Sequence, residues 1–166
     1  MIFQKLRRSC RPVCLLCAGG NNSGLHFRGG TPSASFDGAT ISRGINLSTQ
    51  TAATLSFSAR QSGIGAGETG KVYFSADGSA PTAASVPVYT ISSAADLATT
   101  THNINLAGPF TANARVYFVS STMDATTDNV FVDNISITAT GDTAPGNNYS
   151  TTYTEQLAAK ADVFVE

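Results

Sequence analysis

Apolar and polar residues alternate along much of this chain between His26 and Thr140. The pattern is seen at Thr54–Ala59 and is strongest at Ala114–Val119 and Val130–Thr138. Side chains of a β-strand point to opposite faces in turn, so this alternation predicts strands that bury one face and expose the other. The feature therefore constrains the chain to an all-β fold.

Short turn segments separate the alternating runs. Glycine, proline and aspartate gather at Gly63–Gly70, Asp77-Gly78, Gly108-Pro109 and Asp124–Asp128. Runs and turns at such spacings are typical of antiparallel sandwiches and barrels. About eight strands fit between residues 24 and 140, which predicts one antiparallel jelly-roll-like β-sandwich. Pro87 has no N–H to donate to a sheet ladder, so we expect it in an edge strand or as the first residue of its strand.

The composition agrees with this class. Hydrophobic residues make up 42% of the chain, enough for a core, whereas charged residues make up only 13%. Serine, threonine, asparagine and glycine must therefore supply the polar surface, which favours strands and turns. No apolar run reaches the roughly 20 residues of a membrane span, and a net charge of −1 gives no basic stripe for nucleic acid. We expect neither membrane insertion nor a nucleic-acid partner.

The N-terminal piece differs from the rest. Five of the ten basic residues and no acidic residue precede Asp37. All the cysteines lie there too: Cys10, Cys14 and Cys17. We expect residues 1–23 to be a disordered or non-native leader. A secretory signal, a lipoprotein signal and a zinc site formed by the cysteines with His26 are the alternatives.

The C-terminal piece also changes character. Gly141–Asn148 has the composition of a linker, and a short polar strand is predicted after it at Tyr149–Thr154. A lone strand cannot bury itself. We therefore expect residues 24–140 to form the sandwich module, and residues 141–166 to be a linker and the start of a following repeat module.

Three aspartates form the best candidate for a metal site. Asp124, Asp128 and Asp133 lie in or beside the last turn of the sandwich, with Asn129 and Asn134 nearby. Calcium binds oxygen ligands from carboxylates and carbonyls, so these residues could supply part of a shell. The alternative is that the carboxylates cap turn amides, with a β-bulge at Asp133-Asn134.

Three tyrosines are the candidates for ligand binding. Sugar-binding sites use exposed aromatic rings against the apolar faces of sugars, and this chain contains no tryptophan. Tyr73, Tyr89 and Tyr117 would form a smaller platform if they point outward. If they point inward, they pack in the core with a hydroxyl at its rim.

Catalytic motifs are weak. Gly65–Gly70 matches a dinucleotide-binding pattern, but a strand follows it rather than the helix that phosphate binding needs. We interpret these glycines as a long hairpin turn. The two histidines, His26 and His102, each lie in a predicted strand without a nucleophile motif. We expect no enzyme activity.

Several runs resemble a known group of modules. Asp128–Ile137 has the Y-x-D-N-V-x-I look of the final strand in many bacterial extracellular jelly-roll modules, a group similar to carbohydrate-binding and galactose-binding-like domains. Leu106–Phe118 resembles the strands that come before it. Ile41–Ser48 followed by Ala53–Phe57 looks like the opening strands. Asn148–Glu155 resembles the first strand of cadherin-like repeats, which often follow such a sandwich in large secreted haemolysin-type calcium-binding proteins.

This resemblance, which covers about residues 24–155, implies a non-catalytic module of a secreted or surface-displayed bacterial protein. Its expected role is adhesion or spacing, and its location extracellular or at the cell surface. A carbohydrate-binding module, calcium-assisted or not, is the first alternative, and a capsid-like structural jelly roll is another. The expected partners are an extracellular glycan or neighbouring modules of the same chain.

Overall fold

The structure is a computed structural model that describes residues 13–14, 25–29, 39–123, 125–141 and 151–156. This part of the chain forms ten β-strands, and none of its elements is a helix that could cross a membrane. The strands are β1 (Val13–Cys14), β2 (Leu25–Arg28), β3 (Thr40–Ile45), β4 (Ala52–Ser62), β5 (Thr69–Ser75), β6 (Tyr89–Ser92), β7 (Thr100–Leu106), β8 (Ala114–Ser121), β9 (Asn129–Gly141) and β10 (Thr151–Gln156).

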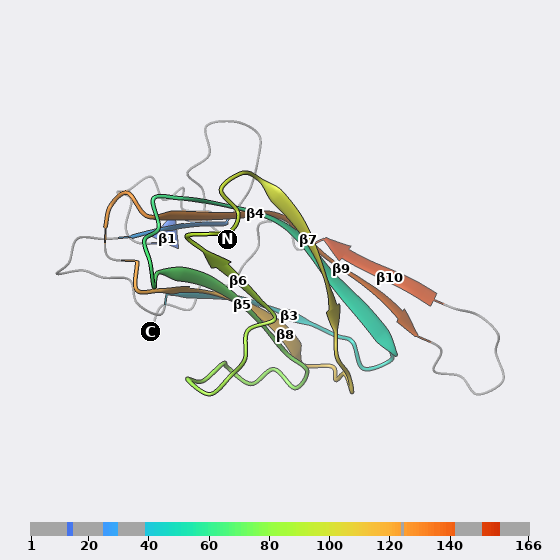
Figure 1. Cartoon of the computed structure of the whole chain (residues 1–166). Helices are drawn as coiled ribbons and strands as arrows, with labels where there is room; N and C mark the ends of the chain where they lie inside the picture. The colour runs from blue at the N-terminus through green and yellow to red at the C-terminus, as the bar shows by residue number, and fades with distance from the viewer. Residues whose placement is uncertain (1–12, 15–24, 30–38, 124, 142–150, 157–166) are drawn as a thin grey trace, which may run out of the picture.

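The strands form two antiparallel sheets that pack face to face (Figure 1). Sheet A has the order β1-β2-β9-β4-β7, with β10 also paired to β9, and sheet B has the order β3-β8-β5-β6. Strands β2 to β9 alone give the two four-stranded orders β2-β9-β4-β7 and β3-β8-β5-β6, which is the strand arrangement of a jelly roll. The predicted fold class, an all-β jelly-roll-like sandwich of about eight strands, is confirmed.

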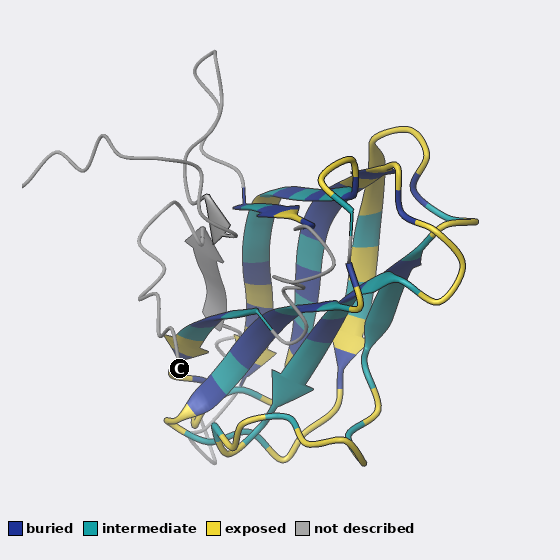
Figure 2. Cartoon of the chain, turned by 90° about the vertical axis from the view of Figure 1, so that its left-hand side faces the viewer, coloured by how far each residue is buried: buried dark blue, intermediate teal, exposed yellow. Residues whose placement is uncertain are grey.

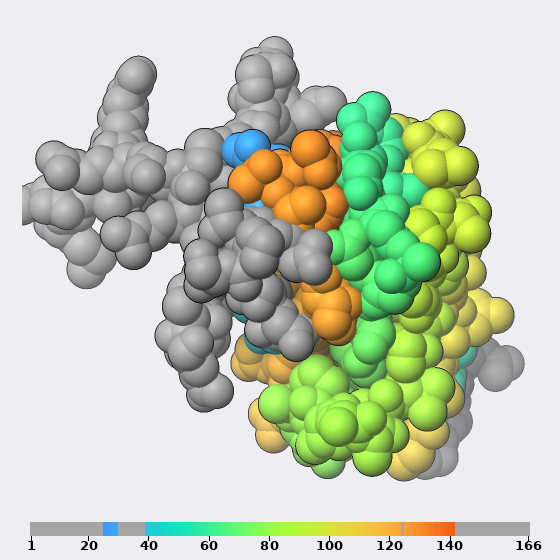
Figure 3. All heavy atoms as spheres, turned by 60° about the vertical axis from the view of Figure 1, so that its left-hand side comes forward, coloured from blue at the N-terminus to red at the C-terminus, as the bar shows by residue number. Residues whose placement is uncertain are grey.

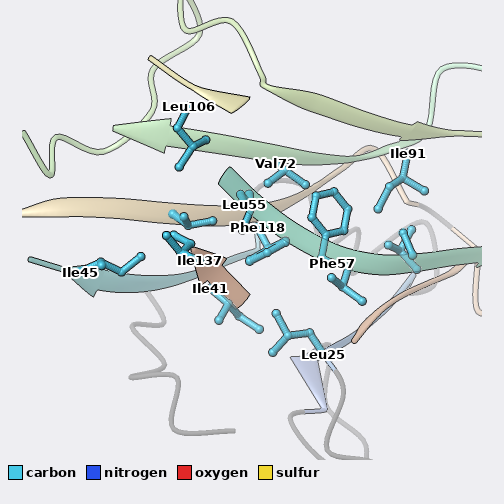
Figure 4. Close-up of a cluster of buried hydrophobic side chains, with 14 of the residues drawn as sticks. Leu25, Ile41, Ile45, Leu55, Phe57, Val72, Ile91, Leu106, Phe118 and Ile137 are labelled. Carbon is cyan, nitrogen blue, oxygen red and sulfur yellow. The ribbon is translucent and has the colours of Figure 1, made fainter. Parts of the chain in front are cut away.

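A single hydrophobic core fills the space between the sheets. Leu55 and Phe57 of β4, Val72 of β5, Val116 of β8 and Ile137 of β9 are all fully buried. Figure 4 shows Leu55, Phe57, Val72 and Ile137 among the side chains that converge from both sheets. Figure 2 shows buried and less buried residues alternating along the strands. The alternation in the sequence therefore reports the two faces of each strand correctly.

The predicted bulge lies in β9. The register between β4 and β9 shifts between Ser56 and Ser58, so that Asn134 and its neighbour Ile135 face a single residue of β4. Asn134 has a φ of 52°, a left-handed conformation that asparagine tolerates better than most residues. Because of this extra residue, β9 keeps its apolar side chains on the core side both before and after the bulge.

Two predictions about turns have different outcomes. Pro87 comes just before β6, which is the edge strand of sheet B, as expected. The glycine-rich segment Gly63–Gly70 does form a turn, but it joins β4 of sheet A to β5 of sheet B. It is thus a connection between sheets rather than a hairpin. Local turn chemistry marks where a strand ends and carries no information on which sheet comes next.

Both ends of the chain add to sheet A. Strand β1 pairs with β2 through Val13 and Cys14. Strand β10 pairs with the C-terminal half of β9, Ser136–Gly141. The other residues of the predicted leader, 1–12 and 15–23, lie outside the described residues. That residues 141–166 begin a following module stays a prediction.

Candidate functional site

An open pocket of about 440 Å³ lies at one end of sheet B, where β3 and β5 end and β8 begins. The loop between β5 and β6, light green at the lower end of the molecule in Figure 3, supplies part of its wall. The lining residues are Gly44, Ile45, Asn46, Asp77, Gly78, Ala112, Asn113 and Arg115. Polar groups predominate among them, so the pocket suits a hydrated polar ligand better than an apolar one.

Hydrogen bonds join the three loops that build the pocket. The amide of Leu47 donates to the carbonyl of Thr111 over 3.0 Å, and the Thr111 hydroxyl donates to the carbonyl of Ala76 over 2.7 Å. The hydroxyl of Tyr117, in the middle of β8, donates to the carbonyl of Gly78 over 2.6 Å. These bonds hold the pocket walls in place without a ligand, which lowers the ordering cost of binding.

Gly78 is required where two of these loops meet. Its φ of 89° lies in the left-handed region that glycine adopts at little cost. A Cβ atom at this position would also clash with the carbonyl oxygen of Asn113. The sequence therefore places glycine beside Asp77 so that the β5–β6 loop can pack closely on the loop before β8.

Asp77 is an exposed carboxylate with only one oxygen engaged. Its Oδ1 accepts hydrogen bonds from the Ser79 hydroxyl, the Ser79 amide and the Ser75 hydroxyl over 2.6, 2.9 and 2.7 Å. These bonds, those from Ser79 first, lower the pKa of Asp77 from 3.8 to about 2. Its Oδ2 has no hydrogen-bond partner within the described part of the chain. Asp77 is thus a fixed, charged acceptor among the residues that line the pocket.

Donor groups face the same pocket. The Arg115 guanidinium donates through Nη1 to the Ser42 hydroxyl over 2.9 Å and lies beside Gly44, where a Cβ would come 3.4 Å from Nη2. Asn46 binds the amide and hydroxyl of Ser48 through Oδ1, at 3.1 and 2.8 Å. The Asn46 side chain therefore keeps its NH₂ group as a donor.

The predicted tyrosines do not form one platform. Tyr73 and Tyr117 are directly paired across β5 and β8, so they share the outer face of sheet B. Tyr117 is only 6% exposed, and burial raises its pKa. Tyr89 pairs with Val72 and packs edge-on against the buried ring of Phe57, on the core side. Only Tyr73, half-buried and with no hydroxyl partner among the described residues, is placed to meet a ligand.

The predicted calcium ligands lie apart. Asp128 is 2% exposed, and its Oδ2 accepts the amide of Ala125 over 2.6 Å. The Oδ1 of Asp133 accepts the amide of Asn134 over 2.7 Å at the bulge. Five residues of extended chain place Asp128 and Asp133 roughly 16 Å apart, too far to share an ion. Asp124 lies outside the described residues, which contain no group of three His, Cys, Asp or Glu that could hold a metal.

A second polar cluster lies between β6 and β7. The Asp96 side chain is 1% exposed, and its Oδ1 accepts the Nε2 proton of His102 over 2.7 Å. Its Oδ2 accepts the hydroxyl of Tyr89 over 2.9 Å. Burial is the larger cause, and this bond to Asp96 the next, of a rise in the pKa of Tyr89 to about 12. The backbone N–H of Gln61 donates to the carbonyl of Asp96, so these contacts tie the β6–β7 connection to the core.

This cluster does not line the pocket, although a histidine beside a carboxylate is a combination that general bases use. The other histidine, His26, stacks on Phe131 with ring centroids 4.3 Å apart and shares a 2.9 Å hydrogen bond with Asn129. Both histidines thus have partners that fix their rings within the sheets. We interpret the Asp96 cluster as a structural element and the pocket as the candidate binding site.

Sequence reasoning missed the pocket residues. Asn46, Asp77, Asn113 and Arg115 are separated by up to 69 positions in the chain, and only the strand order brings them together. The one local signal was the Asp77-Gly78 pair, a turn motif in which the aspartate side chain binds nearby backbone amides. No family model, curated protein or solved structure matches the chain.

Proposed function

We propose that this chain is a non-catalytic adhesion module of an extracellular or cell-surface protein, and that its polar pocket binds a carbohydrate. The observation that carries the proposal is the pocket itself, which is lined by Asp77, Arg115 and Asn46. Among the described residues, one oxygen of Asp77 and the NH₂ group of Asn46 have no hydrogen-bond partner. Sugar hydroxyls both donate and accept hydrogen bonds, so a mixed set of fixed acceptors and donors suits them. The opposite charges of Asp77 and Arg115 favour an uncharged ligand over an ion.

Tyr73 extends this site toward the middle of sheet B. Ser75 is paired with Arg115, and Tyr73 lies two residues farther along β5 on the same outer face. That distance is roughly 7 Å, about the length of one sugar ring. A ring whose hydroxyl has no partner among the described residues can stack on the apolar face of a sugar while the pocket binds its hydroxyls.

A glycan array tests the proposal directly. We expect the full chain to bind one class of neutral glycan, and the Asp77→Asn variant to bind it at least about tenfold more weakly, because a charged acceptor becomes a neutral amide. Asp133→Asn is the matched control, since its carboxylate also accepts a neighbouring amide but lies in sheet A. Its binding should equal that of the unmodified chain.

Two outcomes would change the conclusion. A chain that binds no glycan at concentrations near 1 mM, about −4 kcal/mol of binding free energy, would be a spacer rather than an adhesion module. A parallel array with a calcium chelator separates the calcium-assisted alternative. Loss of binding in the chelator and in Asp133→Asn, but not in Asp77→Asn, would move the site to the aspartates of the last turn.

A further inference from the structure

Strand β7 forms one edge of sheet A, and no described strand covers its outer side. It is seven residues long and pairs only with β4 within the described part of the chain. Proteins usually block such edges with a charge, a proline, a bulge or a very short strand, because free N–H and C=O groups recruit further strands. At the edges of sheet B, β3 carries Arg43, and β6 is four residues long and follows Pro87. The seven residues of β7 contain none of these features.

The outer face of β7 carries a row of hydroxyl and carboxamide side chains. Asn105 accepts the Thr54 hydroxyl over 3.1 Å through Oδ1, and Asn103 accepts the Ser56 hydroxyl through the same atom. Both asparagines therefore retain an NH₂ group with no partner among the described residues. Thr101 follows in the same row, with its hydroxyl 3.2 Å from that of Ser58.

We propose that β7 pairs antiparallel with β7 of a second copy of this chain, around a two-fold axis at Asn103. Asn103 is the middle residue of the strand, so this register uses all seven residues. It also keeps outward residues opposite outward residues, because paired positions share a face. Asn103 then meets Asn103 of the second copy, and Thr101 meets Asn105. Sheet A continues without interruption into sheet A of the second copy.

This register is self-complementary. The free NH₂ group of each Asn103 faces a carboxamide oxygen that still has one lone pair, and the free NH₂ group of Asn105 faces a threonine hydroxyl. The Thr101–Asn105 pairs would repeat the Thr54–Asn105 pair already present on this face. On the inner face His102 meets Ile104, and His102 is held by Asp96 of its own chain. No like charges are brought together.

Cysteine cross-linking tests both the pairing and its register. In a chain with Cys10, Cys14 and Cys17 replaced by serine, Asn103→Cys places two thiols on the axis, where paired Cα atoms lie roughly 4.5–5.5 Å apart, within the range of a disulfide. We expect a covalent dimer under mild oxidation. Asn105→Cys is the matched control, because its two copies would lie roughly 13 Å apart and cannot bond. Equal cross-linking of both variants, or of neither, would overturn the proposal.

Sedimentation equilibrium provides an independent measurement. We expect the unmodified chain to approach twice its 17.1 kDa mass at high concentration. Asn103→Lys would place two ammonium groups at the axis and weaken the dimer at least about tenfold. Thr138→Lys introduces a lysine on the same face of sheet A, but on the interior strand β9, and should leave the dimer unchanged. A monomer at every concentration would refute the inference.

Discussion

Two aspartates of this chain show how differently the same side chain is used at the end and in the interior of the sandwich. Asp96 is buried, and both of its oxygens are occupied, one by His102 and one by Tyr89. Asp77 is fully exposed, and serines occupy one oxygen while the other has no partner among the described residues.

The difference separates stability from binding. A buried carboxylate with both oxygens satisfied has no capacity left for a ligand, and its removal would leave buried donors without partners. An exposed carboxylate held by its own turn contributes little to stability, but it offers a positioned acceptor. We therefore expect changes at Asp96 to destabilise the fold, and changes at Asp77 to affect binding.

Asp96→Ala should have the largest effect. It leaves the Tyr89 hydroxyl and the His102 ring without an acceptor, and it places alanine at a φ of 58°. We expect the free energy of unfolding to fall by about 3 kcal/mol, measured by urea denaturation and far-UV circular dichroism. Asp96→Asn, which keeps an acceptor, should lose less. An unchanged urea midpoint in Asp96→Ala would contradict the structural role.

Gly78→Ala should have an intermediate effect, on both stability and binding. The left-handed φ and the clash with Asn113 together should lower the free energy of unfolding by about 1–3 kcal/mol and displace the loop that carries Asp77. Gly67→Ala is the matched control, because its φ is 91° but no atom lies within 4 Å of the added Cβ. If both variants lose equal stability and keep equal glycan binding, the contact between the pocket loops contributes neither to stability nor to binding.

Asp77→Asn should have the smallest effect on stability, one that is present above pH 4 and disappears in acid. The folded pKa of Asp77, about 2, lies below its ordinary value of 3.8, so its carboxylate stabilises the fold above pH 4. That contribution is lost as the pH falls from about 4 to about 2. Urea midpoints measured across this interval should therefore depend less on pH in Asp77→Asn than in the unmodified chain. Identical pH profiles would show that the serine hydrogen bonds do not persist in solution.

The fold could be predicted from the sequence because its signals are local. The alternation in β4, β8 and β9, the bulge at Asn134 and the edge position of Pro87 each depend on neighbours in the chain. The strand after Gly63–Gly70 could join either sheet. The choice depends on contacts with residues that are distant in the sequence. That part of the topology could not be inferred from the turn.

The binding site was harder to predict because it also depends on contacts between residues that are distant in the sequence. Tyr73 and Tyr89 look equivalent in sequence, yet one lies outside sheet B and the other packs on Phe57, because the phase of a strand is set by its partners. Asp128 and Asp133 are close in sequence, but an extended strand separates them. Asn46 and Arg115 are distant in sequence and meet in the pocket.

The cross-strand pairs on the outer face of sheet A have a consequence for the environments that the module can occupy. Thr54 with Asn105, Ser56 with Asn103 and Ser58 with Thr101 are all uncharged. Dissolved ions screen interactions between charges and have little effect on such pairs. These three pairs can therefore keep the same contacts from fresh water to brine.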